Sequence, residues 1–521
     1  MTMKTAIFAT PLFLILAACA AGGHTSGQTQ GDDSSQPDAG GDDAGEGGLA
    51  SGDDGGSSPV GTRGDAGGDA CGTTDTPDDQ GVDSNCDGAD GIVGTDVYVD
   101  PSSGEDTNEG TPMAPLRTLT AALKLATSRG GSVLVDAGTL TDSDVSATGT
   151  WAIYGGYPTT FVGAPQRALT IVTPLSSGLL VEQAASARLA HMTIQGQPPA
   201  TGSDAFAYGV RTSAAKLALD DMDIEAAPAG SGTSGTAGTA GAAGGTYGSG
   251  SQKCNGALAP QWTNGATAAN GYATSPDGVT KPGVWPKTPA KQATSGLAGT
   301  DGVDATGKLT LSNGLASSDV GTAGAADGTP GYGGAGATGN GTNVCDYAYD
   351  QMEIQGGFGG NGGCPGGGGK AGTGGGSSIA LLVISGHVDV TRSNLQASLG
   401  GRGGDGGAGG AGGAGGMGSE PTKLSGTGTL SVPSACPAPA KDPMQLECAA
   451  YGGQGGNGGA GGHGGGGAGG WSVGVLSASG ATAGIDSTTT VTVSKGGAGG
   501  AGSQGLRAPS GQSHSQYTLS P

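Results

Sequence analysis

Three stretches of the chain share one pattern: residues 187–195 read ARLAHMTIQ, residues 217–225 read LALDDMDIE, and residues 388–396 read VDVTRSNLQ. In each stretch the first, third, sixth and eighth positions are apolar, apart from Ser393. Short alternating runs on either side of a corner are typical of β-strands, and the surrounding Thr, Ser, Val and Gly disfavour amphipathic helices. The first two copies start thirty residues apart, and this spacing predicts stacked units that bury their apolar faces against one another. A looser fourth copy lies in residues 471–495.

The segment before these copies predicts a strand, a helix and two more strands. Residues 97–99 are strand-like, residues 115–129 have apolar side chains at helical spacing before Gly130-Gly131, and residues 133–135 and 151–154 are again strand-like. This order resembles the opening of right-handed parallel β-helix proteins of the pectate-lyase-like superfamily, in which a helix plugs the open end of the coil. The resemblance implies an all-β, right-handed parallel β-helix with an N-terminal capping helix. The expected coil segments are 96–228, 377–400 and 471–495.

Glycine-rich inserts interrupt the expected coils at 229–376 and 401–470, and a Gly-rich tail follows at 496–521. From Gly400 to Gly418 the chain reads Gly-Gly-X, and a period of three matches the polyproline-II helix, in which two Gly per turn let neighbouring helices approach. The tracts resemble the PGRS repeats of bacterial surface proteins, for which bundled polyglycine-II helices are proposed. Flexible linkers are the alternative. Residues 245–350 do not fit this pattern, and we predict no structure for them.

The N-terminus determines the expected location. Residues 1–18 combine Lys4 with a short apolar run, and Leu16-Ala17-Ala18-Cys19 resembles the lipobox of a bacterial lipoprotein signal. The resemblance implies cleavage before Cys19, attachment of lipid to its thiol, and anchoring to the envelope, at the outer membrane or cell surface. The alternative is an ordinary secretory signal with a chance Cys. Residues 19–81, rich in Gly, Ser and Asp, are expected to be a disordered acidic tether.

The composition argues against one class of partner. The 521 residues include 116 Gly and carry a net charge of −23, which argues against binding nucleic acid.

After lipidation of Cys19, seven cysteines would remain in an oxidising compartment, where disulfides are expected. Two pairs can close local loops: Cys71 with Cys86, and Cys436 with Cys448. Three cysteines compete for a third bond, namely Cys254, Cys345 and Cys364.

Residues 82–95 contain the oxygen-rich pattern D-x-N-x-D-G of a calcium loop. Position twelve is Gly94 where an EF-hand has Glu, and no helices flank the loop. The stretch is more similar to a short Cys-containing metal-binding motif found before β-helix domains in glycine-rich lipoproteins of soil bacteria. That resemblance implies calcium ligands at Asp83, Asn85, Asp87 and Asp90, and a bond from Cys86 to Cys71. The alternative is an Asp-rich turn stapled by a disulfide.

The aligned copies also predict a polar column. Stacking would place His191, Asp221 and Arg392 on neighbouring strands, with Asp223 on the outward face beside them. A solvent-facing ion ladder explains such a column. The functional alternative is a polysaccharide-contact face, with Asp221 and Asp223 binding a cation or sugar and Arg392 taking an acidic substituent.

The fold also suggests a pectin-type enzyme, but the motifs are incomplete. Asp220-Asp221 gives an isolated DD and Gly462-His463-Gly464 gives a GHG inside a Gly-Gly-X tract, whereas NTD and RIK are absent. We therefore expect a non-catalytic surface protein with a structural, adhesive or matrix-contact role. The alternatives are a carbohydrate-binding or carbohydrate-cleaving β-helix and a calcium-dependent self-associating surface protein.

Overall fold

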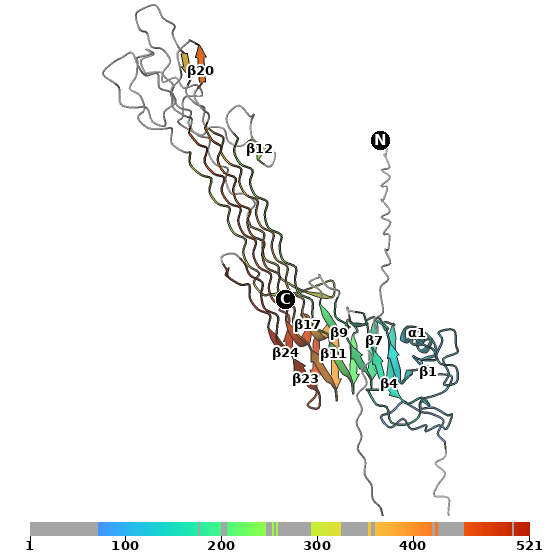
Figure 1. The fold of residues 1–521 in the computed structure, drawn as a ribbon. Helices are drawn as coiled ribbons and strands as arrows, with labels where there is room; N and C mark the ends of the chain where they lie inside the picture. The colour runs from blue at the N-terminus through green and yellow to red at the C-terminus, as the bar shows by residue number, and fades with distance from the viewer. Residues whose placement is uncertain are drawn as a thin grey trace, which may run out of the picture. The chain divides into compact units, whose positions relative to one another are not determined.

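The computed structural model describes residues 71–175, 178–199, 206–245, 293–324, 360–418, 453–502 and 505–520. It also gives the backbones of four short strands: β12 (Lys253–Cys254), β13 (Ala257–Leu258), β16 (Glu353–Gln355) and β20 (Thr422–Ser425). Within these residues the protein is an all-β fold with parallel sheets and a single helix, α1 (Figure 1). No helix in the described part of the chain is long and apolar enough to span a bilayer.

Three parallel sheets form the framework. The seven-stranded sheet has the order β1 (Val97–Val99), β2 (Val133–Asp136), β4 (Gly149–Tyr157), β7 (Ala184–Ala190), β10 (Lys216–Asp220), β18 (His387–Thr391) and β22 (Thr482–Ile485). The six-stranded sheet contains β3 (Gly138–Leu140), β5 (Thr170–Val172), β8 (Thr193–Gln195), β11 (Asp223–Ala226), β19 (Asn394–Ala397) and β23 (Thr490–Val493). The five-stranded sheet contains β6 (Leu179–Val181), β9 (Ala207–Thr212), β17 (Ser378–Val383), β21 (Ser472–Ser477) and β24 (Ser513–Thr518).

From β6 onward the chain visits these sheets in a fixed order: five-stranded, seven-stranded, then six-stranded. Three further rounds follow, at β9 to β11, at β17 to β19 and at β21 to β23, and β24 starts another. The register matches the sequence alignment, since Leu219 pairs with Leu189 and Val390, and Ile224 pairs with Ile194 and Leu395. These side chains are fully buried in one core that all three sheets share. The predicted repeat is therefore confirmed at the level of strand pairing.

Helix α1 (Leu119–Arg129) packs on the first strands of the seven-stranded sheet. It begins later than the predicted residue 115, because Leu116 still donates its backbone N–H to Tyr98, 2.9 Å away. The Thr118 side chain then caps the helix by accepting from the Ala121 amide. Gly130, at φ 75°, ends it as the sequence predicts. Leu119 and Leu123 are buried against the core, so the helix covers one end of it.

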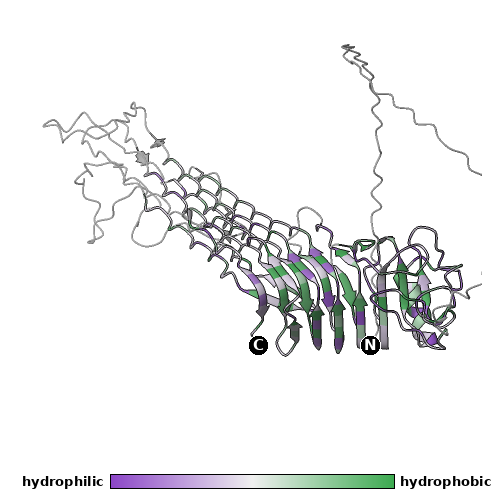
Figure 2. Cartoon of the chain, turned by 90° about the horizontal axis from the view of Figure 1, so that it is seen from below, coloured by the Kyte–Doolittle hydropathy of each residue, from purple (hydrophilic) through white to green (hydrophobic). Residues whose placement is uncertain are grey.

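The glycine-rich tracts lie side by side as extended segments (Figures 1 and 2). We call this assembly the glycine-rich bundle; its main segments are 229–245, 293–305, 360–376, 400–418, 453–470 and 496–501. Hydrogen bonds between neighbouring segments recur at every third residue: Gly404 donates to Thr373, Gly407 to Lys370 and Gly410 to Gly367, over 2.8–2.9 Å. The spacing agrees with the predicted period of three.

Glycine is required at these positions because the backbones nearly touch. A Cβ atom at Gly404 would lie 2.0 Å from the carbonyl oxygen of Thr233, and one at Gly407 would lie 2.1 Å from that of Thr236. By contrast, the third residues of the triplets in 400–418 are exposed or half-buried, and Ala408 is exposed. Close approach of backbones, as at a collagen axis, is thus what the repeated Gly-Gly pairs provide.

Three parts of the structure differ from the sequence-based boundaries. Residues 71–81, assigned to the tether for their composition, belong to a loop in which the Gly72 amide donates to Ser84. Residues 293–324, for which no structure was predicted, contain a bundle segment followed by the hairpin of β14 (Leu309–Ser312) and β15 (Leu315–Ser318). The tail at 496–521 contains the strand β24.

Candidate functional site

The predicted column lies where the chain turns from the seven-stranded to the six-stranded sheet. His191, Asp221 and Arg392 occupy the equivalent corner of successive rounds, and all three have left-handed backbones, with φ of 56°, 50° and 51°. The corners are hydrogen-bonded in sequence, because His191 donates its amide to Asp220 and Asp221 donates its amide to Thr391. A non-glycine residue in this region costs of order 1 kcal/mol, so the strands on both sides must hold it there. The backbone column is therefore as the alignment predicted.

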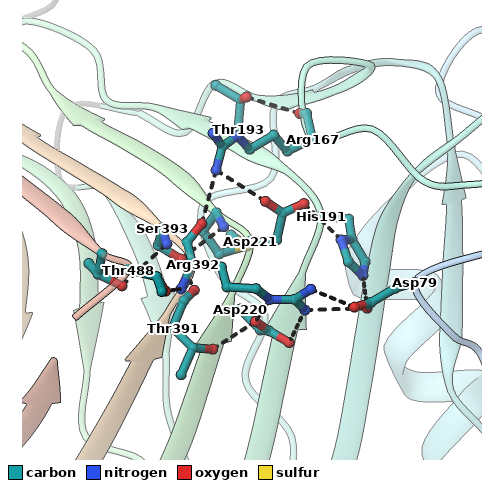
Figure 3. A network of polar contacts seen from close by, with 12 residues as sticks. Asp79, Arg167, His191, Thr193, Asp220, Asp221, Thr391, Arg392, Ser393 and Thr488 are labelled. Carbon is teal, nitrogen blue, oxygen red and sulfur yellow. Dashed lines mark hydrogen bonds and ion pairs between the residues drawn. The ribbon is translucent and has the colours of Figure 1, made fainter. Parts of the chain in front are cut away.

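The side chains pair along only part of the column: His191 contacts Asp221, whereas Arg392 turns to other partners (Figure 3). Arg392 donates to both oxygens of Asp220, at 3.0 and 2.8 Å, and also to the carboxylate of Asp79. Asp221 is paired with Arg167 instead, at 3.1 Å. Among the described residues no ion pair joins Asp221 to Arg392; Asp220, one residue earlier, binds the guanidinium instead.

His191 is buried, with 3% of its surface exposed, although the sequence placed it beside a solvent-facing ladder. Its Nδ1 is 3.0 Å from Asp221 and its Nε2 is 3.2 Å from Asp79, the second at ion-pair distance without hydrogen-bond alignment. Asp79 belongs to the loop closed by the disulfide between Cys71 and Cys86, whose Cα atoms are 5.5 Å apart. This loop reaches the corner and covers the imidazole.

The network neutralises its own charge. Three carboxylates (Asp79, Asp220, Asp221) meet three guanidinium groups (Arg167, Arg188, Arg392). The hydrogen bond from Arg392 lowers the pKa of Asp79. Burial alone would raise the pKa of Asp220, but hydrogen bonds from Arg392 and Thr391 outweigh it and lower that pKa. The arrangement acts as a clamp that holds the disulfide loop against two rounds of strands, with its carboxylates and guanidinium groups already engaged with one another.

Asp223, the other residue of the predicted contact face, lies in β11 in register with Thr193 and Asn394. It is half-buried and no ion pair joins it to the clamp among the described residues. The motif residues considered for an enzyme lie on different elements: Asp220-Asp221 is at the corner after β10, whereas His463 is in the glycine-rich bundle.

The predicted calcium ligands fall into two places. Asp83, Asn85 and Asp87 form one exposed turn, in which Asp83 accepts from the amides of Asp87 and Gly88 at 3.1 and 2.9 Å. Asp87 in turn accepts from the Val93 amide at 2.8 Å. Among the residues that the structure describes, no group of three or more His, Cys, Asp or Glu side chains is arranged to hold a metal ion. The geometry is that of a turn whose carboxylates bond to the backbone.

Asp90, the fourth predicted ligand, points into the protein. It is fully buried, accepts the hydroxyl of Tyr157 at 2.6 Å, and leaves its other oxygen without a hydrogen-bond partner. Burial raises the pKa of this carboxyl to about 6. Asp90 is therefore separated from the exposed turn, and its role is in the core around Tyr98 and Tyr157.

This raised pKa has a measurable consequence for stability. The folded protein holds the Asp90 proton more tightly than the unfolded chain, so the contribution is favourable at low pH and is lost as pH rises through about 6. We expect Asp90→Asn to stabilise the protein at pH 8 by roughly 1–3 kcal/mol and to have little effect at pH 4. Urea denaturation at both pH values measures the difference; an equal effect at pH 4 and 8 would contradict the assignment. Asp87→Asn, in the exposed turn, is the control.

The remaining cysteines are only partly described. The predicted pair of Cys71 and Cys86 is bonded, and Cys364 is also disulfide-bonded. Cys19, Cys436 and Cys448 lie outside the described residues, as does the whole segment 1–70.

The column predicted from the sequence did not include four members of the clamp. Arg188 and Asp220 are polar positions inside the aligned copies, so the same alignment could have indicated them. Asp79 and Arg167 lie outside the repeat, and no pattern in the chain signals their contact. Comparisons of the chain with protein-family models, with curated proteins and with solved structures found no match.

Proposed function

We propose that this chain is a non-catalytic, lipid-anchored protein of the bacterial envelope, at the outer membrane or cell surface, with a structural, adhesive or matrix-contact role. The observation that carries the proposal is the glycine-rich bundle, whose neighbouring segments are hydrogen-bonded at every third residue. A bundle of this kind is stiff, since each segment is tied to its neighbours along its length. Stiffness suits a spacer or a contact surface and is not needed for a flexible linker.

The fold that we propose for this role is a right-handed parallel β-helix carrying a polyglycine-II bundle. The recurring order of the three sheets and the in-register pairing of equivalent residues support a helical coil of strands. Helix α1 on the first strands corresponds to the expected cap. A bond at every third residue is what neighbouring threefold helices make, which supports the polyglycine-II assignment.

Anchoring is supported by the sequence of the N-terminus and by the position of the clamp. The sequence Leu16-Ala17-Ala18-Cys19 is followed by a long acidic segment that ends at the disulfide loop. Any pull exerted through a membrane-bound Cys19 would reach the strands through this loop. The Cys71–Cys86 bond and the clamp at Asp79 strengthen the point where that pull enters the fold.

Replacing the lipidated residue tests the anchor. Cys19→Ala should abolish lipid attachment and either move the protein from the membrane to the soluble fraction or leave its signal uncleaved. Fractionation with immunoblotting and mass spectrometry of the mature N-terminus measures both. Ser34→Ala, in the expected tether, is the control and should be processed and retained like the parent protein. A correctly processed Cys19→Ala protein that stays in the membrane would contradict lipid anchoring.

Two further measurements address the alternative functions. Purified protein incubated with a panel of acidic polysaccharides, with and without calcium, should show no turnover; cleavage of any of them would reject the non-catalytic role. Light scattering during calcium titration addresses self-association, for which the exposed turn at Asp83 and Asp87 is the candidate contact.

A further inference from the structure

A cleft of about 650 Å³ lies between the hairpin β14–β15 and the end of the five-stranded sheet. The hairpin covers the outer face of this sheet: Leu309 and Ala316 are buried against Ile379, Val473 and Leu476. The Tyr208 hydroxyl accepts the Ala316 amide at 3.0 Å and fixes the hairpin in place. The cleft follows β21 and β24 from Trp471 and Gln512 to Ser479 and Ser520.

An aromatic cluster forms one side of this cleft. The ring centroids of Trp471 and Tyr517 are 4.9 Å apart, and His514 lies 4.9 Å from Tyr517 and 5.4 Å from Trp471. Trp471 is buried and its indole N–H donates to the carbonyl of Gly307 at 3.2 Å. Tyr517 is half-exposed. The buried Trp471 thus fixes the cluster in place, while part of the Tyr517 ring faces the cleft.

The polar groups of the cleft are neutral or positive. Lys308 and Gln512 are exposed at its rim with the hydroxyls of Ser479 and Ser520. Among the described residues no carboxylate lines the cleft itself; Asp319 lies behind the lining and accepts from the amides of Thr306 and Gly307. Gln512 Oε1 is 2.8 Å from His514 Nε2 and must accept from it, which leaves the Gln512 amide group to donate. In a chain with 44 acidic and 21 basic residues, Lys308 is the one charged side chain in this lining, and it is positive.

We propose that this cleft binds a carboxylated oligosaccharide. A sugar ring has an apolar face that packs on an aromatic ring such as Tyr517, and a hydroxyl rim that fits the amide and hydroxyl groups around it. The Lys308 ammonium meets the carboxylate of the sugar, and local charge complementarity favours an acidic glycan over a neutral one. A peptide added as a strand beside β24, the edge strand of its sheet among the described residues, is the other class of occupant; it would use the backbone of β24 and would not require Lys308.

Calorimetry on the purified full chain at low salt tests this proposal. The probes are a glucuronate-containing tetrasaccharide and its carboxyl-reduced, uncharged counterpart. The acidic tetrasaccharide should bind more tightly than the reduced one. Lys308→Gln should weaken the acidic probe at least tenfold and leave the reduced probe unchanged. Tyr517→Ala should weaken both probes at least tenfold.

Lys216→Gln is the matched control, because Lys216 is equally an exposed lysine but lies on β10, away from the cleft. It should bind both probes like the parent protein. The proposal is overturned if the acidic tetrasaccharide does not bind, if Lys308→Gln and Lys216→Gln behave alike, or if only extended peptides bind. Lys308 is exposed, so its replacement leaves the fold intact even if Tyr517→Ala does not fold. Glycan binding is a property beyond the proposed envelope role, and this measurement does not depend on the lipid anchor. A negative result would therefore overturn glycan binding alone, whereas lipid anchoring is tested separately by the fractionation of Cys19→Ala.

Discussion

Gly404→Val with Gly407→Val is expected to open the glycine-rich bundle while leaving the three sheets folded. Each new side chain would place its Cβ about 2 Å from a carbonyl oxygen of the neighbouring segment, at Thr233 and Thr236. Overpacking of this kind costs roughly 1–3 kcal/mol per site, and the segments must separate to relieve it. Separation of these two segments would also break the hydrogen bonds that join them, from Gly235 to Asp405 and from Gly238 to Ala408.

Amide hydrogen exchange followed by mass spectrometry separates the bundle from the sheets. In the parent protein the amides of residues 400–418 should be protected, and in the double variant they should exchange like those of a free peptide. Amides of β18 and β19 should keep their protection in both proteins. Ala408→Val is the matched control, because it adds the same side chain in the same segment at an exposed position. Equal exchange in the parent and the double variant would show that the tract is a flexible linker.

Arg392→Ala should release the disulfide loop from the corner. The substitution removes the guanidinium from Asp79, and it leaves Asp220, whose side chain is only 13% exposed, with Arg188 and the Thr391 hydroxyl as its remaining partners. Because the Arg392 side chain is 44% exposed and Asp220 keeps Arg188, we expect a cost of about 1–2 kcal/mol for the lost charge-assisted hydrogen bonds. Arg402→Ala is matched in exposure, at 45%, but Arg402 contacts a single carboxylate within its own segment and should cost less than about 0.5 kcal/mol.

Chemical denaturation gives the cost, and limited proteolysis of residues 71–86 shows whether the loop has detached. Lowering the pH should also weaken the clamp and destabilise the protein, as Arg392→Ala does. The pKa values of Asp79 and Asp220 are lowered in the folded protein, so the stabilisation is complete above the ordinary carboxyl range near 4 and is lost as pH falls below it. A loop that stays equally resistant to protease in Arg392→Ala and in the parent at neutral pH would mean that the clamp does not hold it.

The strand framework could be predicted because it repeats within the sequence. Apolar residues alternate on both sides of the corners at His191, Asp221 and Arg392, and a shift by one residue would turn every buried side chain outward. The strict Gly-Gly-X tract at 400–418 similarly gave the period of its hydrogen bonds. Both signals are local, which is why the register and the period could be derived without a structure.

Other parts carried weaker signals or none. Segment 229–245 has one Gly in most triplets where 400–418 has two, and it lies at an exposed border of the bundle, where only one face meets neighbours. Strand β24 reads SHSQYT and is largely exposed, so it lacks the apolar alternation of the inner strands. Asp79 and Arg392 are 313 residues apart and meet only because the loop folds back, and a contact of this kind leaves no periodic trace. The chain also separates Asp90 from Asp83, since burial beside Tyr157 turns it inward.

Hydrogen bonding at every third residue also limits how the length of this protein can vary over evolutionary time. Gain or loss of one or two residues inside a tract would shift the phase and put alanine, aspartate or arginine where backbones touch. A change of three residues keeps the phase, provided that the outgoing and returning arms of one excursion change together. The strands are unaffected, because the excursion leaves after β19 and returns at β21 whatever its length. The length of the glycine-rich bundle can therefore change between related proteins only in steps of one triplet, about 9 Å each.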